Sequence, residues 1–276
     1  MLRRILIIDD HDDLASALDE AFSQIGHDVV TLESHIDALA IDDIDSFDVV
    51  ISDLDVDASI IASCPQGHTP TCLPEIPSIS NGDHIKAFKI SASNFRRDEF
   101  DESELRGLVE MILNYKAKFV DKEDVVQCMH ETIEFELPSS ISIMHSILDY
   151  LMKRVEKLGV IKAEQSNLFV ALDEAFVNAI KHGNKFDARK LVRIAAEVSK
   201  QEARFIIEDE GEGFDVNAIP DPLDPENLFK SSGRGVLFIY NIMDEVKYNE
   251  RGNRLTMIKK SEFPSFDPGP EIRPAR

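Results

Sequence analysis

Residues 168–183 read LFVALDEAFVNAIKHG and form the most informative stretch of the chain. Apolar residues recur there at helical spacing and predict an amphipathic helix, through Leu168, Leu172, Ala175, Phe176, Ala179 and Ile180. Glu174, Asn178 and His182 follow one another at intervals of four, so they stack along the opposite side of that helix. An amide oxygen can ligate Mg²⁺, and a carboxylate one turn away can orient or deprotonate a nucleophile. Taken alone, the pattern is equally compatible with a solvated helix face.

Two glycine motifs follow the helix within about 60 residues. The strand predicted at 204–208 runs into Asp209, Gly211 and Gly213, where the acid can accept hydrogen bonds and the glycines let the backbone approach a ligand. Residues 233–235, Gly-Arg-Gly, precede a helical run, and free N–H groups at a helix start favour phosphate. Either glycine motif alone would suggest a plain loop, but the ordered set of three motifs indicates a nucleotide site.

Together these motifs resemble the ATPase domain shared by histidine kinases, gyrase and the bacterial anti-sigma serine kinases, and the short form resembles the last group most. The resemblance implies an α/β sandwich over residues 131–262 that binds ATP and Mg²⁺. It implies that Asn178 ligates Mg²⁺, that Asp209 reads the adenine amino group, and that Glu174 is the general base for a serine hydroxyl. The remaining nucleotide contacts implied by the resemblance are His182, Gly211, Gly213, Gly233, Arg234 and Gly235.

The first half shows strand–helix alternation, which predicts a doubly wound parallel sheet. Asp9, Asp10 and Asp53 follow predicted strands, and the carboxyl ends of parallel strands meet at one edge of a sheet. Three clustered carboxylates repel unless a cation such as Mg²⁺ neutralises them, and a carboxylate can also accept a phosphoryl group. The alternative is that these acids are solvated strand ends.

Residues 5–10 and 49–53 resemble the receiver domain of two-component response regulators, over roughly residues 1–118. The resemblance implies that Asp53 is the phospho-acceptor, that Asp9, Asp10 and Asp53 hold Mg²⁺, and that an upstream kinase donates the phosphoryl group. Receiver domains carry a lysine after their fifth strand, and that position falls near Arg97 in this sequence. They also carry a serine or threonine after the fourth strand, which Ser80 matches loosely. A receiver-like domain that is never phosphorylated and serves for docking therefore stays open.

The two expected domains meet at a mixed, charged segment, residues 119–130, which suits a linker. A helix over 103–118 should close the first domain, and residues 263–276 lack any helix or strand period and are expected to be disordered. The helix expected over 141–158 has an apolar stripe that favours a core-facing helix over a dimer seam. His145 lies on it, and a phospho-acceptor histidine there would make the chain an atypical histidine kinase.

Composition limits the partners. The chain has 276 residues, 43% of them hydrophobic, and a net charge of −22, which disfavours direct contact with nucleic acid or an anionic membrane. Three cysteines make a poor disulfide framework, so we expect a cytoplasmic protein. Cys64, His68 and Cys72 are interpreted as incidental neighbours rather than as a zinc site.

The function predicted from these resemblances is bacterial signal transduction. The chain would be a receiver-regulated serine/threonine protein kinase of the anti-sigma type, acting on an anti-sigma antagonist protein, a sigma factor or both, and forming a homodimer through its output domain. The main alternative is a non-catalytic, ATP-binding partner-switching module.

Overall fold

The computed structural model describes residues 2–11, 13–41, 43–57, 84–97, 101–121, 130–161, 167–216 and 234–261. The first half contains these elements: β1 (Arg4–Asp9), α1 (Asp13–Gln24), β2 (Asp28–Leu32), α2 (His35–Leu39), η1 (Ile44–Ser46), β3 (Val49–Asp57), β4 (His84–Ser91), η2 (Ser93–Arg97), α4 (Glu102–Tyr115) and the π-helical turn η3 (Lys116–Val120). The second half contains β5 (His130–Pro138), α5 (Ile141–Lys157), α6 (Leu168–Asn178), the π-helical turn η5 (Ala179–Gly183), β6 (Leu191–Ser199), β7 (Glu202–Asp209), α7 (Arg234–Ile242), β8 (Glu245–Tyr248) and β9 (Arg254–Lys260).

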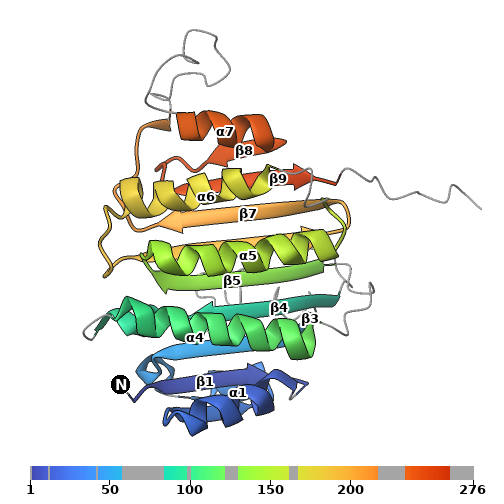
Figure 1. Cartoon of the computed structure of the whole chain (residues 1–276), viewed down its shortest axis with the longest axis vertical. Coiled ribbons are helices and arrows are strands. Elements are labelled where there is room, and N and C mark those ends of the chain that lie inside the picture. Colours follow the sequence, from blue (N-terminus) through green and yellow to red (C-terminus); the bar gives the residue numbers. More distant parts are fainter. Residues whose placement is uncertain are drawn as a thin grey trace, which may run out of the picture.

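One sheet runs through both halves of the described chain (Figure 1). Its strand order is β2-β1-β3-β4-β5-β6-β7-β9-β8. The halves meet where β4 pairs with β5 in parallel, from Ile85 opposite His130 to Ser91 opposite Glu136. The strands of the second half pair antiparallel to one another. The described chain is therefore joined across its middle by backbone hydrogen bonds.

The first half departs from the predicted parallel sheet at one strand. β2, β1 and β3 are parallel, as expected. β4 is antiparallel to β3, with Asp53 opposite Phe88, so the prediction of an all-parallel sheet is wrong there. The reversed strand brings the chain back along β3, which places β4 alongside the first strand of the second half.

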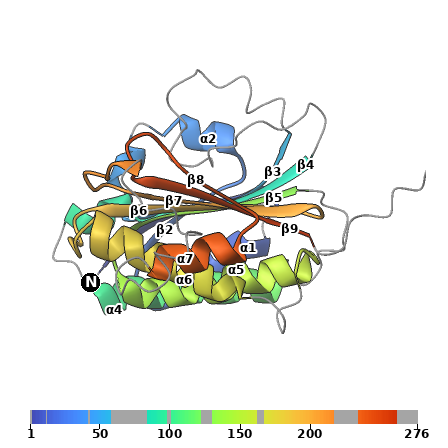
Figure 2. The same ribbon diagram turned by 90° about the horizontal axis from the view of Figure 1, so that it is seen from above.

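The helices lie mainly on one face of the sheet. Figure 2 shows α1, α4, α5, α6 and α7 on that face and α2 on the other. One apolar core extends under the main helical layer from Ile5 in β1 to Met257 in β9. A smaller core, which includes Leu6, Ile8 and Phe47, lies on the α2 side. The stripe of α5 faces the large core, since Met144, Leu148, Leu151 and Val155 are buried, as the core-facing interpretation predicted.

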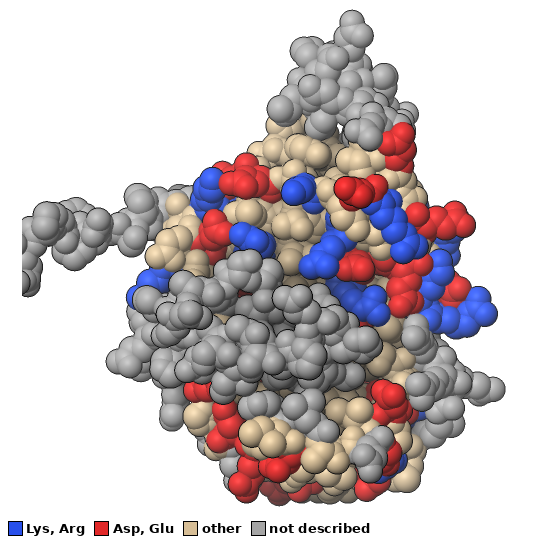
Figure 3. All heavy atoms as spheres, turned by 180° about the vertical axis from the view of Figure 1, so that it is seen from behind, with Lys and Arg blue, Asp and Glu red and all other residues tan. Residues whose placement is uncertain are grey.

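The opposite face of the second half's strands is charged. Lys89 pairs with Glu134 at 3.2 Å, Arg193 with Glu136 at 2.9 Å, and Arg254 with Glu208 at 3.5 Å. Figure 3 shows cationic and acidic side chains interspersed over this part of the molecule. Such mixed pairs cover a sheet face with polar groups, so the large core needs only one layer of helices. Within the described ranges, no helix has both the length and the apolar character needed to cross a membrane.

Candidate functional site

A cavity of about 450 Å³ lies between α6, α7 and the β7–β9 strands. Volumes of this order are typical of small-molecule sites. The cavity brings together residues from all three sequence motifs, which are separated along the chain by up to 61 positions. Of the predicted contacts, it is lined by Glu174, Asn178, His182, Asp209, Gly213 and Gly235.

Asp209 sits at the end of β7, directly against the end of the motif helix. Only 9% of the residue is exposed, and its Oδ1 accepts the N–H of Gly211 at 2.8 Å. A Cβ on Gly183 would collide with the Asp209 carboxylate, so a glycine is required at the close approach of the two segments. Burial raises the pKa of Asp209, and the Gly211 N–H opposes that rise. Among the described residues only Oδ1 has a hydrogen-bond partner, so Oδ2 could accept a hydrogen bond from a ligand.

Glu174 and Gly235 form the other close approach in the cavity. A Cβ on Gly235 would overlap the Glu174 carboxylate, so the first turn of α7 lies directly against that acid. Both residues line the cavity, and Asn178 lies one turn further along the helix from Glu174. The arrangement places a carboxylate, an amide and the start of a helix around one space, and the helix start favours an anion such as phosphate.

Asn184 is a residue whose role the sequence did not reveal. It is fully buried, and its Nδ2 donates to Ser139 Oγ at 2.6 Å and to the Leu191 carbonyl at 2.8 Å. Its Oδ1 accepts the N–H of Glu210 at 2.9 Å. Asn184 therefore ties the end of β5 and the start of β6 to the loop that carries Asp209. Its only sequence signal is its place directly after the motif helix.

The turn between β8 and β9 holds the same loop from the other side. Asn253 donates from Nδ2 to the Asp209 carbonyl at 2.8 Å, and its own carbonyl accepts the Asp209 N–H at 3.0 Å. Arg251 donates to the Gly211 carbonyl at 2.8 Å, and its carbonyl accepts the N–H of Phe214 at 3.1 Å. Asp209 is thus fixed by backbone and side-chain bonds on both sides.

An aromatic pair lines the cavity beside this turn. The rings of Phe214 and Tyr248 meet edge to face, with centroids 5.2 Å apart. Burial raises the pKa of Tyr248 to about 12, so its hydroxyl is neutral at physiological pH. The cavity that Asp209 lines therefore also has an aromatic wall, which suits a heteroaromatic base.

The three aspartates predicted to share a metal in the first half have separate partners. Asp9 is buried, and its carboxylate accepts the N–H groups of His11, Leu14 and Ala15 at 2.8–3.1 Å, so it serves the start of α1. Asp10 accepts the N–H of Asp55 at 2.8 Å. Among the described residues, no group of three or more His, Cys, Asp or Glu side chains is placed to hold a metal ion. The structure therefore gives the predicted magnesium set no support.

Asp53 is paired with Lys116, a residue that the sequence did not single out. Lys116 Nζ lies 3.0 Å from Oδ1 and 3.2 Å from Oδ2 of Asp53, and only 1% of Lys116 is exposed. Burial raises the pKa of Asp53 to about 6, although Lys116 opposes the rise. Lys116 is the first residue of η3, so the amine that meets Asp53 comes from a helix end rather than from the neighbourhood of Arg97.

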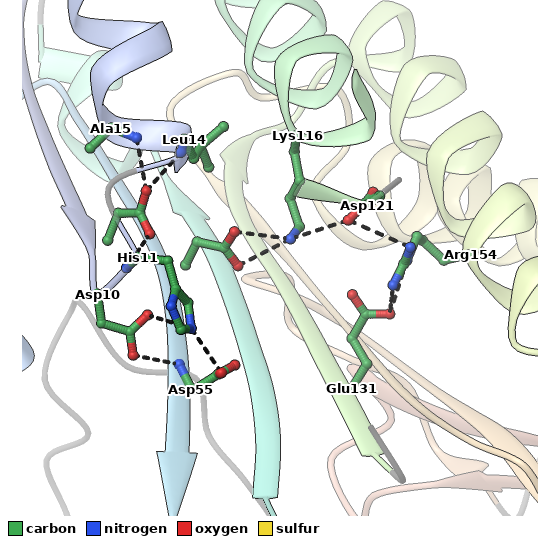
Figure 4. A network of polar contacts seen from close by, with 11 residues as sticks. Asp10, His11, Leu14, Ala15, Asp55, Lys116, Asp121, Glu131 and Arg154 are labelled. Carbon is green, nitrogen blue, oxygen red and sulfur yellow. Dashed lines mark hydrogen bonds and ion pairs between the residues drawn. The ribbon is translucent and has the colours of Figure 1, made fainter. Parts of the chain in front are cut away.

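The ion pair continues into the second half (Figure 4). Asp121 lies 3.4 Å from Lys116 Nζ and 3.5 Å from an Arg154 nitrogen. Arg154, on α5, donates two hydrogen bonds to Glu131 of β5, at 2.9 and 2.8 Å. All five side chains of this buried ionic chain are at most 7% exposed. Asp121, in the segment expected to be a linker, is therefore part of the interior.

Some predicted positions lie outside the described residues. They include Gly233, the side chains of Arg97 and Arg234, Ser80, the Cys64-His68-Cys72 group and the tail from 263 to 276. Gly211 is placed against the cavity motif, since a Cβ there would meet Asp209 and the Gly183 carbonyl. His145 is exposed, and its ring contacts the Ile141 carbonyl at 3.3 Å.

Comparison with known proteins agrees with the cavity in the second half. Residues 138–259 match a family model described as a histidine kinase-like ATPase domain. Serine-protein kinase RsbW from Staphylococcus epidermidis is 29% identical over 142 residues, which cover 49% of this chain and 89% of that protein. RsbW from Staphylococcus aureus strain Newman is 27% identical over 142 residues, which again cover 49% of this chain and 89% of that protein. The prediction of an ATPase-type domain in the second half is thereby confirmed.

Replacing Asn184 tests the support of the Asp209 loop. Asn184→Ala removes three buried hydrogen bonds and leaves their partners unpaired, so the free energy of unfolding should fall by about 3 kcal/mol. Urea unfolding measures this loss. The control is Asn241→Ala on α7, where an exposed amide makes one bond to the Leu237 carbonyl and removal should cost less than about 0.5 kcal/mol. Equal losses in the two variants would contradict the assigned role.

The variant Asp53→Asn tests whether burial raises the pKa of the Asp53 carboxyl. The pKa of about 6 exceeds the ordinary 3.8, so the folded protein binds this proton more tightly than the unfolded chain does. The contribution is full below about pH 3.8 and is lost as pH rises through about 6. Between these limits the free energy of unfolding should fall by about 3 kcal/mol relative to Asp53→Asn, measured by denaturant titration at each pH. Parallel pH profiles for the two proteins would refute the shift.

Proposed function

We propose that this protein is an ATP-dependent serine/threonine protein kinase of the anti-sigma type. The observation that carries the proposal is that three motifs, distant in sequence, line one cavity of about 450 Å³ in the domain that matches the ATPase model. The matched relatives are named serine-protein kinases, and they align over nearly their whole length. The protein substrate would be an anti-sigma antagonist, and a sigma factor would be a second partner.

In this proposal different residues of the cavity contact the base, the metal, the phosphates and the attacking hydroxyl. Asp209 accepts a hydrogen bond from the base through Oδ2, and the Phe214–Tyr248 pair, which lines the same cavity, packs against the ring. Asn178 offers an amide oxygen to a metal, and the start of α7 offers N–H groups to phosphate. Bound ATP would supply the phosphoryl group, and Mg²⁺ would neutralise charge on the phosphates. Glu174 takes the proton from the attacking hydroxyl.

The first half is proposed to regulate this activity. Phosphorylation of Asp53 by an upstream kinase stays a prediction, and so does a homodimer through the second half. The pairing of both Asp53 oxygens with Lys116 means that a phosphoryl group could be accepted only if Lys116 moved or took up the new charge. A receiver-like module that works without phosphorylation therefore remains the alternative for this half.

Replacing Glu174 separates binding from transfer. Glu174→Gln keeps the shape of the side chain and removes the base, so ATP affinity by calorimetry should stay within about twofold while phosphoryl transfer falls by about 100-fold or more. Transfer is measured by mass spectrometry of candidate antagonist proteins. The matched control is Asp173→Asn, the neighbouring acid on α6, which does not line the cavity and should leave transfer unchanged. Full transfer by the Glu174 variant would reject the assignment.

Replacing Asn178 tests the metal contact. Asn178→Ala removes the amide oxygen, so Mg²⁺-dependent turnover of ATP should be lost while the unfolding midpoint changes little, because the residue lies at the cavity rather than in the core. Nucleotide binding by the unaltered chain without transfer to any partner would instead identify a non-catalytic switching module.

A further inference from the structure

Helix α4 has a polar contact at each end, one with Asp53 and one with Ser140. It runs from Glu102 to Tyr115, and Lys116 follows directly as the first residue of η3. It packs against α1 in the first half and α5 in the second. Leu105, Leu108, Val109, Ile112 and Leu113 bury one face of α4 in the large core.

The C-terminal end of α4 is held by Asp53. Lys116 donates to both Asp53 oxygens, at 3.0 and 3.2 Å, inside the protein. Lys116 also lies over the ring of Phe88, 4.7 Å from its centroid. Without Asp53 the buried amine of Lys116 keeps only the longer contact to Asp121, at 3.4 Å, so a change in the charge or hydrogen bonding of Asp53 favours a new position of Lys116.

The N-terminal end of α4 is held by the second half. Glu102 accepts a hydrogen bond from the Ser140 hydroxyl at 2.7 Å. The hydroxyls of Ser142 and Ser140 keep the pKa of Glu102 below its ordinary value, so the carboxylate is charged at neutral pH. Ser140 is the residue before α5, at the junction where β5 passes into that helix.

From this junction, hydrogen bonds lead to the nucleotide cavity. Ser139, next to Ser140, accepts the Asn184 amide at 2.6 Å, and Asn184 accepts the Glu210 N–H at 2.9 Å. Ser139, Ser140 and Asn184 are all at most 6% exposed. Glu210 follows Asp209 directly, so the bond from the Glu210 N–H to Asn184 helps to fix the position of Asp209. The connection is continuous from Asp53 to that loop.

We propose that α4 is a lever that couples the state of Asp53 to nucleotide binding, through Lys116 at one end and the Glu102–Ser140 hydrogen bond at the other. The proposal rests on the nucleotide site proposed above and names its regulation. When the Asp53–Lys116 pair is formed, α4 keeps the position in which Glu102 binds Ser140. Ser139 then holds Asn184, and Asn184 holds the Asp209 loop. Breaking the pair shifts α4, loosens the junction and weakens nucleotide binding.

The test measures ATP affinity of the full chain by calorimetry. Asp53→Asn and Lys116→Met should each weaken binding by threefold or more. The matched control is Glu104→Gln, on the same helix, whose carboxylate pairs with Arg3 at 2.9 Å within the first half. That variant should leave the affinity within 1.5-fold of the unaltered chain. The double variant Asp53→Asn/Lys116→Met, which leaves no isolated charge, keeps the test usable if a single variant fails to fold.

A double-mutant cycle distinguishes a lever from separate local effects. Glu102→Ala should weaken ATP binding by itself, because it removes the far contact of the lever. If one helix carries the effect, Lys116→Met combined with Glu102→Ala should bind ATP no more weakly than the worse single variant. Coupling is also reciprocal, so ATP should shift the titration of the Asp53 carboxyl carbon in an NMR experiment.

The outcomes separate this proposal from the proposed function. Folded variants that bind ATP as the unaltered chain does would overturn the lever and leave the kinase proposal standing. Additive losses in the cycle, or an Asp53 titration that ATP does not move, would also overturn the lever. Failure of the unaltered chain to bind ATP would overturn both proposals.

Discussion

The parallel pairing of β4 with β5 is the constraint on which the rest of the structure depends. β4 is the last strand of the first half, and β5 is the first strand of the ATPase-like half. The two strands are paired along all of β4 except its first residue. A single apolar core then continues beneath α4 and α5. Edge strands of a sheet expose unpaired backbone groups, so this pairing also removes an edge from each half. Within the described chain the two halves share one sheet and one apolar core.

The buried ionic chain is difficult to explain by stability alone. Asp53, Asp121 and Glu131 face Lys116 and Arg154 with little access to solvent, so both charge types pay for desolvation. Well-packed apolar residues of similar size often serve a fold as well as a buried ion pair does. What an ionic chain adds is sensitivity, because removing one charge leaves its neighbours uncompensated. Its position across the join between the halves is therefore more consistent with communication than with stabilisation.

The nucleotide motifs could be predicted because their spacing is local. Glu174 and Asn178 lie on α6, His182 lies on the η5 turn that continues it, and Gly211 stands two residues from Asp209. The approaches of Gly183 to Asp209 and of Gly235 to Glu174 join residues distant in sequence and were not predictable in this way. β6 was missed, although its alternation of buried and less buried residues along 191–199 carries a period-two signal. Lys116 could not be found this way. It looks like an ordinary polar residue at a helix end, and its partner Asp53 is 63 positions away.

The reversal of β4 was equally hidden, because strand direction depends on the connection between strands rather than on the strand's own residues. His84–Ser91 would show the same alternation in either direction. The reversal decides which groups meet, since it sets Asp53 opposite Phe88 and brings Ile133 of β5 opposite Phe88 on the other side. A sequence that resembles a family over its first strands can therefore depart from that family's sheet without any local sign of it.

Both polar centres lie on the helix-covered face of the sheet. Asp53 shares that face with Val49 and Ile51 of the large core, and Asp209 shares it with Phe205 and Ile207. The opposite face of the second half carries paired charges that are more open to water, and such pairs contribute little energy to fix one strand against another. A change at Asp53 is therefore transmitted more strongly through the helical layer, where Asp53, Lys116, Ser140 and Asn184 are buried. Because α4 and α5 pack against each other at the join between the halves within that layer, a shift of one helix is felt directly by the other.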